Sequence, residues 1–232
     1  MGKRIIVQAR GKGSSTYRVR KRAFRHKLQF PKKLEGEGQV IKLFNSSAHT
    51  APLAKIKSPA GIFYIPAFEK MVEEQKIKFG GKEIKNGSIL KLENIPVKTP
   101  IYCIESNPGD GGKFIKTAGN SATINKIVGK DVFVTMPSKK EKKFNKNCRA
   151  IIGTIAGHGR LEKPILKAGR QFHRKKAKSK LWPRTSAVKM NAIDHPFGSG
   201  RAKNVKSKIA KRNAPPGRKV GLIRPRRTGK KK

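Results

Sequence analysis

Short apolar runs, most of which alternate with polar residues, recur between residues 39 and 155. This alternation is typical of half-buried β-strands, because successive side chains point to opposite faces of a sheet. Turn-forming pairs such as Asn86–Gly87 and Gly129–Lys130 separate several of the runs. We therefore expect strands at residues 39–44, 52–57, 61–66, on both sides of the turn within 82–92, and at 100–105, 122–128, 131–136 and 149–155.

Helical patterns are scarce. Residues 68–75 (FEKMVEEQ) fit a short helix or a helical turn, and Pro164 opens a segment, ILKAGRQFHRKKAK, that fits one or two helical turns. Many short strands at close spacing favour small barrels over a layered α/β fold. The loop NPGDGG, residues 107–112, is the natural joint between two such barrels. The expected fold class is mainly β, with two small barrels.

Positive charge is concentrated at the two ends of the 232-residue chain, whose formal net charge is +44. Residues 1–34 hold 12 Lys/Arg and no acid, and residues 166–232 hold 23 Lys/Arg and one acid, Asp194. The other 22 basic residues share residues 35–165 with 12 acids, a composition that allows a globule. The ends carry too much charge to offset their ordering entropy by burial, so we expect them to be wholly or partly disordered in the free protein.

A polyanion is the partner that this charge predicts, and nucleic acid is the most abundant one. The ends differ from plain solubilising tails, because Phe172, Trp182, Pro183 and several glycines are interleaved with the charge. Phe172 and Trp182 either stack on unpaired bases or pack against the second barrel. Both alternatives stay open.

Several other classes of function are disfavoured. No run of about 18 apolar residues is present, so we expect no membrane partner. The Gly-Lys pairs do not complete a phosphate-binding P-loop, and Glu73–Glu74 is expected to be solvated surface, not an acid–base pair. Cys103 and Cys148 lie far apart in apolar segments, so we expect reduced, buried thiols rather than a disulfide or a zinc site. We expect neither a metal nor a cofactor.

The segment NAIDHPFGSG, residues 191–200, places Asp194 directly before His195. An aspartate that orients a histidine is typical of a general base. However, adjacent residues on an extended segment point in opposite directions, and no Ser, Cys or metal partner is evident. We therefore expect a turn in which Asp194 caps backbone amides and His195 hydrogen-bonds a phosphate or a ribose 2′-hydroxyl. The rival hypotheses are an RNA-processing enzyme that uses this pair and a chromatin-like protein that compacts DNA.

Four blocks of the sequence together carry a resemblance to a known family. They are GKRIIVQARGKGSSTYRVRKRAFRHKL at the start, NPGDGGKFIKTAGNSATI at the joint, CRAIIGTIAGHGR, and SAVKMNAIDHPFGSGR in the tail. In order and spacing, along nearly the whole chain, they resemble the second of the universal large-subunit ribosomal proteins, the L-two family. The basic N-terminal block is more similar to the archaeal and eukaryotic branch than to the bacterial one.

The resemblance implies a domain organisation. It places a basic N-terminal extension at residues 1–34, an oligonucleotide-binding-type barrel at 35–111, an SH3-like barrel at 112–165 and a basic C-terminal extension at 166–232. It also implies that both long, irregular extensions thread into large-subunit rRNA.

The resemblance further implies a function without catalysis. The chain is expected to be a structural constituent of the large ribosomal subunit in the cytoplasm, and a primary rRNA-binding protein. It is expected to support subunit association, tRNA binding and the peptidyl transferase region. The implied partners are large-subunit rRNA, other large-subunit ribosomal proteins, and the small subunit at the subunit interface.

Three residues match the block that approaches the peptidyl transferase region in this family: Asp194, His195 and Pro196. Bacterial members commonly have a second histidine where Phe197 stands and glycine where Ser199 stands, and many members have proline where Ala192 stands. These departures disfavour a paired-histidine metal site. They leave an RNA-docking turn intact.

The expected rRNA contacts are mostly basic side chains of the two ends and the joint. Arg149, Arg160, Arg170 and Arg201 are the better candidates for bidentate contacts with phosphate or guanine, whereas lysine runs 139–140 and 230–232 are expected to be diffuse screening charge. The complete set of expected rRNA-binding residues is Arg4, Arg10, Lys12, Arg18, Arg20, Arg22, Arg25, Lys113, Lys116, Arg149, Arg160, Arg170, Arg174, Lys175, Lys176, Trp182, Arg184, Asn191, His195, Arg201, Arg218 and Arg224.

Overall fold

The structure is a computed structural model that describes residues 2–81, 83–199, 209–210 and 213–223. The chain divides into two compact units. The central unit is Arg20–Ala168, and the terminal unit combines Met1–Val19 with Gly169–Lys232. Among the described residues, no helix has both the length and the apolar character needed to cross a bilayer.

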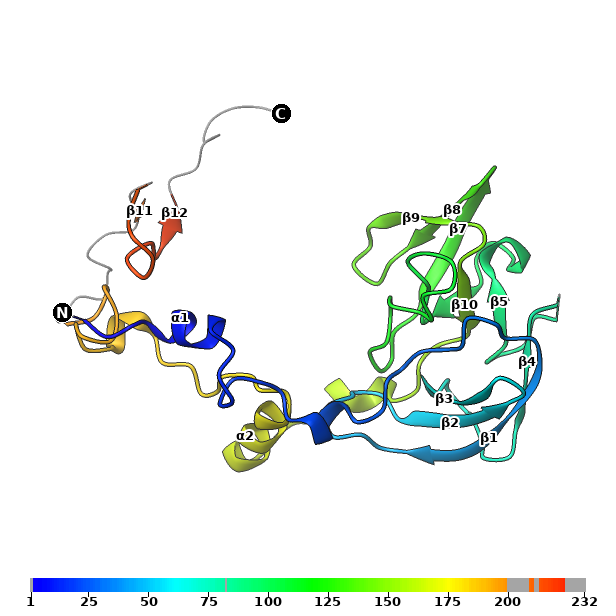
Figure 1. The fold of residues 1–232 in the computed structure, drawn as a ribbon, viewed down its shortest axis with the longest axis horizontal. Coiled ribbons are helices and arrows are strands. Elements are labelled where there is room, and N and C mark those ends of the chain that lie inside the picture. The colour runs from blue at the N-terminus through cyan, green and yellow to red at the C-terminus, as the bar shows by residue number, and fades with distance from the viewer. Residues whose placement is uncertain (1, 82, 200–208, 211–212, 224–232) are drawn as a thin grey trace. The chain divides into compact units, whose positions relative to one another are not determined.

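The central unit holds a ten-stranded sheet with the strand order β3-β2-β1-β4-β5-β10-β6-β7-β8-β9 (Figure 1). The first five strands are β1 Gly36–Phe44, β2 Leu53–Ser58, β3 Gly61–Pro66, β4 Lys76–Phe79 and β5 Ile89–Lys91. The other five are β6 Pro100–Tyr102, β7 Ala122–Val128, β8 Asp131–Thr135, β9 Glu141–Asn145 and β10 Arg149–Ile152. Neighbouring strands are antiparallel except β4 and β5. The mainly β prediction is confirmed.

Two hairpins form where turn residues separate alternating runs. Strands β2 and β3 pair from Ser58 opposite Gly61 to Leu53 opposite Pro66. Strands β7 and β8 pair from Val128, directly before the Gly129–Lys130 turn. In both cases local chemistry determines the register, because a short turn leaves little freedom to the strands that it joins.

Two segments differ from the prediction. Residues 68–75 form turns and not a helix, and Lys70 and Glu74 have φ values of 65° and 67°, which a right-handed helix does not allow. Residues 83–88 contain the expected turn at Asn86–Gly87 but no strand before it; Lys82 lies outside the described residues. The single strand after this turn, β5, pairs with β10 and β4 instead of closing a hairpin.

Strands β4 and β9 were missed by the sequence-based prediction. Strand β4 has only four residues, of which Ile77 and Phe79 are buried. Strand β9 has a single buried side chain, Phe144, and lies at the edge of the sheet. Charged residues are typical of edge strands, since they discourage pairing with other chains. Because most positions of such a strand are charged, it shows no apolar alternation and is not recognised from the sequence.

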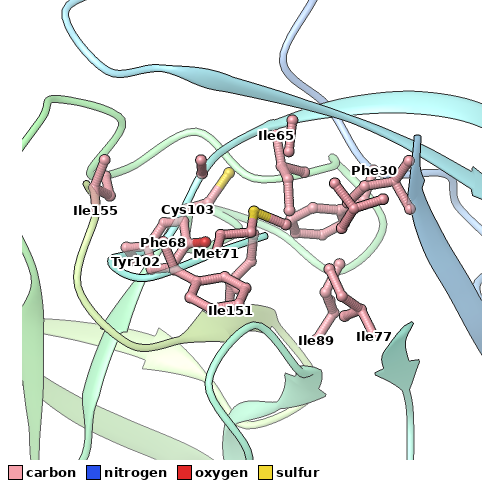
Figure 2. Close-up of a cluster of buried hydrophobic side chains, with 14 of the residues drawn as sticks. Phe30, Ile65, Phe68, Met71, Ile77, Ile89, Tyr102, Cys103, Ile151 and Ile155 are labelled. Atoms are coloured by element: carbon pink, nitrogen blue, oxygen red, sulfur yellow. The ribbon is translucent and has the colours of Figure 1, made fainter. Parts of the chain in front are cut away.

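Two hydrophobic clusters lie on opposite sides of the middle strands. On β10, Ile151 belongs to one cluster and Ile152 to the other. On β6, Tyr102 and Ile101 divide in the same way, and Figure 2 shows Tyr102, Ile151 and their neighbours in the first cluster. Strands with both faces buried read as continuous apolar runs, which explains PIYCIE and RAIIGTI in the sequence. The division into two barrels, with a boundary at residue 111, stays a prediction.

Part of the predicted N-terminal extension contributes to the core of the central unit. Phe30 is 1% exposed and belongs to the first cluster (Figure 2). Leu34 belongs to the same cluster. Leu28 is also buried. The predicted thiols are present: Cys103 and Cys148 are free and buried. Burial raises the pKa of Cys103 to about 12 and that of Cys148 to about 11, so both are inert at neutral pH.

The helices of the described chain are short. The terminal unit contains α1 Ile6–Gly11, which the sequence did not predict, and all but the first residue of α2 Ala168–Ala177, which falls in the segment where helical turns were expected. It also contains a two-residue parallel pair, β11 Ile209–Ala210 and β12 Leu222–Ile223. None of the residues of α1 or α2 is buried, so packing within the free protein stabilises these helices little.

Candidate nucleic-acid interface

Residues 190–199 of the terminal unit form a closed turn. The amide of Ser199 donates to the carbonyl oxygen of Met190 at 3.0 Å, which ties the two ends together. Gly198 packs against this closure, because a Cβ at that position would lie 2.2 Å from the carbonyl oxygen of Asn191. The turn therefore requires glycine at position 198, and the turn predicted from NAIDHPFGSG is confirmed.

The imidazole of His195 is fixed inside this turn. The amide of Phe197 donates to Nδ1 of His195 at 3.0 Å, so the proton of the neutral ring is on Nε2. Burial lowers the pKa of His195, and protonation of Nδ1 would break the hydrogen bond from Phe197. At neutral pH, His195 therefore presents a single donor, Nε2–H. Such a donor suits a phosphate oxygen or a ribose hydroxyl.

Asp194 does not have the expected capping role. Its carboxylate lies 3.7 Å from Nζ of Lys3, and within the described residues no backbone amide donates to it. The side chain that accepts an amide in this turn is instead His195. The amide of Lys3 also donates to the carbonyl oxygen of Ile193 at 2.8 Å. Since the Lys3 and Asp194 side chains are 72% and 43% exposed, the backbone contact positions the N-terminal segment more than the ion pair does.

A cavity of about 980 Å³ opens beside this turn within the terminal unit. Its wall brings together segments far apart in the sequence, and it includes five residues expected to bind rRNA or to lie near the peptidyl transferase region: Arg4, Lys12, His195, Pro196 and Arg218. The wall also contains Lys3, which the set of expected contacts omitted although it is one of the basic residues of the N-terminal segment. Four cations and one neutral donor therefore surround a space at the upper end of the range for ligand sites.

The other expected contacts of the terminal unit lie outside this cavity. Helix α2 carries Arg170, Arg174, Lys175 and Lys176 with no acid in its first turn. Arg18 lies beside the segment that follows α2, since Oγ of Ser179 donates to its carbonyl oxygen at 2.7 Å. The remaining expected residues with a described position are Arg10 on α1, half-buried Trp182, and exposed Arg184 and Asn191. Arg201 and Arg224 lie outside the described residues.

Phe172 projects from α2 and is 40% exposed, with Nζ of Lys176 at 5.5 Å from its ring centroid. This cation–π geometry keeps a positive charge beside the ring. An exposed aromatic ring among cations is compatible with base stacking. The stacking role of Phe172 and Trp182 stays a prediction.

In the central unit, a buried ion pair anchors the NPGDGG joint. Glu105 is fully buried, and its carboxylate accepts the guanidinium of Arg149 at 2.7 Å and the amide of Gly111 at 3.0 Å. The same guanidinium donates to the carbonyl oxygens of Pro31 and Lys32. Arg149 thus links a strand, the joint and the N-terminal segment. Its predicted contact with RNA stays a prediction beside this structural role.

Other predicted cations near the joint are also engaged within the protein. Lys113 pairs with Asp110 at 3.2 Å, and Nζ of Lys116 donates to the carbonyl oxygen of Leu28 at 2.8 Å. Nε of Arg160 donates to the carbonyl oxygen of Ala118 at 3.4 Å. Burial alone would raise the pKa of Asp110, but hydrogen bonds from backbone amides of the loop and from Lys113 lower it overall. By contrast, Arg20, Arg22 and Arg25 are exposed.

The chemistry of the Asp194–His195 pair is limited by its geometry. Nδ1 of His195 is occupied by a backbone amide, and Asp194 faces Lys3. In the described part of the chain, no group of three or more His, Cys, Asp or Glu side chains is arranged to hold a metal ion. The arrangement suits anion binding through fixed donors.

Comparison with known proteins identifies a family. Residues 85–217 match the model described as ribosomal proteins L2, C-terminal domain. The chain is 46% identical over 235 residues to the large ribosomal subunit protein uL2 of Archaeoglobus fulgidus, with 99% of each chain covered. It is 42% identical to the protein of that name from Methanococcoides burtonii and 43% identical to that from Hyperthermus butylicus, each over 237 residues and with all of both chains covered.

Proposed function

Because the chain belongs to the uL2 family of large ribosomal subunit proteins, we propose that it is a structural, rRNA-binding constituent of the large ribosomal subunit in the cytoplasm. The proposed partners are large-subunit rRNA and other proteins of that subunit. The observation that carries the RNA-binding proposal is the cavity of the terminal unit, around which Lys3, Arg4, Lys12, Arg218 and His195 converge.

The proposed mechanism is electrostatic. Each Lys or Arg that reaches a phosphate releases about one counterion, so the logarithm of the affinity falls with the logarithm of the salt concentration by about 0.9 per contact on a duplex. The terminal unit supplies many such side chains and one acid, Asp194. Specificity comes from the tertiary shape of the rRNA and from unpaired nucleotides, because double-helical RNA hides its base edges.

The first test is a competition between nucleic acids. The full chain is expected to bind large-subunit rRNA at least tenfold more tightly than duplex DNA of equal length at 150 mM salt, because fixed donors such as Nε2–H of His195 select RNA shape and 2′-hydroxyls. Filter binding with labelled rRNA and unlabelled competitors measures the ratio. Equal competition by DNA would support a DNA-compacting protein instead.

A finer part of the proposal concerns His195. We propose that the turn at residues 190–199 supports the peptidyl transferase region, and that the protein also supports tRNA binding and subunit association. His195→Gln removes the imidazole, whose Nδ1 accepts the amide of Phe197 and whose Nε2–H is the free donor. We therefore expect assembled subunits with impaired tRNA binding or peptide-bond formation. The circular dichroism spectrum of the free protein should be unchanged.

The matched control for this variant is His173→Gln, which changes an exposed histidine of the same unit on helix α2. Subunits that carry this control are expected to behave as wild type. If both variants supported peptide-bond formation equally well, the proposed role of His195 would be wrong. Multiple-turnover chemistry by the isolated protein that is lost in His195→Gln would instead identify an enzyme.

A further inference from the structure

The outer face of β1, β2 and β3 is a charged surface, and none of the residues expected to bind rRNA belongs to these three strands. Strand pairing places Lys42, Lys55 and Tyr64 side by side in one row across the three strands. Lys57 and Ile62 form part of the next row. Residues with the opposite orientation, such as Val40, Ile56 and Phe63, are buried in the first hydrophobic cluster. The row residues therefore face away from the core.

The lysines of this face have no acidic partner. Within the described residues, no ion pair involves Lys42, Lys55 or Lys57. Lys42 and Lys57 are exposed, and Lys55 is half-buried. Elsewhere in the central unit, lysines such as Lys78 and Lys143 do pair with acids. Three unpaired lysines on adjacent strands repel one another, and an external anion removes that repulsion.

A basic segment of the same unit lies along this face. The ring of His26 packs on those of Phe44 and Tyr64, with centroids 4.8 and 4.6 Å apart. The amide of Gln29 donates to the carbonyl oxygen of Tyr64 at 3.2 Å, and Oγ of Ser46 donates to that of Ala23 at 3.4 Å. These contacts fix the position of residues 20–27. The exposed cations of that segment are Arg20, Lys21, Arg22, Arg25 and Lys27.

One large apolar side chain in this segment is exposed. Phe24 ends a 3-10 helix, Lys21–Phe24, and is 48% exposed although its neighbour Ala23 is buried. Its ring contacts His49 edge-on at 5.0 Å between centroids, so its position is defined. An ordered aromatic ring among cations is the combination that single-stranded nucleic acid uses, with bases on the ring and phosphates on the charges.

We propose that this face, formed by Phe24, Lys42, Lys55 and Lys57, binds an unpaired stretch of RNA. Phe24 stacks on a base that is not in a helix, and the three lysines bind phosphates of the same stretch. The proposal rests on the proposed function, which makes rRNA the partner. RNA fits better than an acidic protein segment, because a protein partner needs a central apolar patch, and the face offers chiefly cations, with Phe24 and Ile62 as its well-exposed apolar side chains.

The first test compares four full-length proteins for affinity to large-subunit rRNA: wild type, Phe24→Ala, Phe24→Trp and Leu161→Ala. Phe24→Ala is expected to weaken binding roughly tenfold or more, since one stacked base is lost, while Phe24→Trp retains wild-type affinity. Leu161→Ala is the control, because Leu161 is a 77% exposed apolar residue outside the face. Wild-type affinity for Phe24→Ala, or an equal loss in Phe24→Trp, would overturn the stacking contact.

The second test measures the lysines through the salt dependence of binding. Replacement of Lys42, Lys55 and Lys57 by Gln should reduce the slope of log affinity against log salt by about 2, at about 0.7 per contact on single-stranded RNA. The matched control replaces Lys130, Lys139 and Lys140, three exposed lysines of the same unit. This control removes the same charge and should leave the slope nearly unchanged. Equal reductions in both triple variants would show general attraction and contradict a defined face.

Crosslinking in assembled subunits identifies the occupant. A photoreactive phenylalanine analogue at position 24 is expected to crosslink to an unpaired rRNA nucleotide. A crosslink to a base-paired nucleotide or to another ribosomal protein would contradict the proposal. Failure of the proposed function gives a different result, because wild type itself would then show no preference for rRNA over duplex DNA.

Discussion

A fragment of residues 20–168 is expected to fold on its own and to lose most of the rRNA affinity of the full chain. Both hydrophobic clusters lie entirely within these residues. The fragment lacks 27 of the 57 Lys and Arg residues and only one of the 13 acids, so its formal net charge is +18 instead of +44. Deletion of the two ends therefore removes phosphate contacts and leaves the hydrophobic core unchanged.

The salt dependence of binding measures this loss. If about eight basic residues of the ends contact phosphates, the affinity of the full chain should fall on the order of 10⁴-fold between 50 and 200 mM salt. The fragment should show a much shallower dependence, to which Lys42, Lys55 and Lys57 contribute. Circular dichroism and a cooperative urea transition check that the fragment is folded. A fragment with the affinity and the salt slope of the full chain would show that the ends are not the main anchor.

The sequence predicted those parts of the fold that local chemistry determines. The hairpins β2–β3 and β7–β8 follow from alternation on both sides of a short turn. The helix predicted at residues 68–75 is wrong because two of these residues have positive φ, which their residue types do not indicate. Strand β9 was not predicted because its charged residues, which suit an edge strand, leave only one buried apolar residue and therefore no apolar alternation. Both errors have the same cause, since the conformation of each segment depends on backbone hydrogen bonds to a strand elsewhere in the sequence. Glu74 and Gln75 bond to Val40 of β1, and β9 pairs with β8.

The same limit applies to the candidate site. The block NAIDHPFGSG predicted a turn, and its glycine at 198 is required by a close backbone approach. The sequence could not show that residues 2–4 and 216–218 meet this turn at one cavity. Nor could it show that His195 rather than Asp194 accepts an amide, since that choice depends on how the turn orients each side chain. The residue types indicated anion binding, but only contacts between distant segments of the chain determine which of these residues line the same cavity.

Arg149 shows how a buried partner changes the interpretation of a basic residue. As an arginine it was a candidate for bidentate contacts with phosphate or guanine, whereas the structure surrounds its guanidinium with Glu105 and two carbonyl oxygens. Its side chain is 13% exposed, and that of Glu105 is fully buried. In the central unit, therefore, a cation next to a buried acid holds the protein together, while exposed and unpaired cations remain for RNA.

Glu105→Leu is expected to destabilise the central unit by about 3–5 kcal/mol, because it leaves the Arg149 charge largely buried without its partner. It also removes the acceptor for the amides of Gly111 and Arg149, so the joint loses its anchor to β10. Urea unfolding followed by far-ultraviolet circular dichroism measures the change. Tryptophan fluorescence is unsuitable, since Trp182 lies in the terminal unit.

Two further variants separate the charge from the side chain. The double variant Glu105→Leu/Arg149→Leu should recover much of the lost stability, because a buried ion pair can be replaced by apolar residues at little cost, whereas a single unpaired charge cannot. Glu37→Gln, which removes one partner of a half-exposed pair with Lys78, should have almost no effect. If Glu105→Leu were as mild as Glu37→Gln, the buried pair would not be what holds the joint. If the double variant were no more stable than the single one, the stabilisation would come from the hydrogen bonds to the backbone and not from pairing of the two charges.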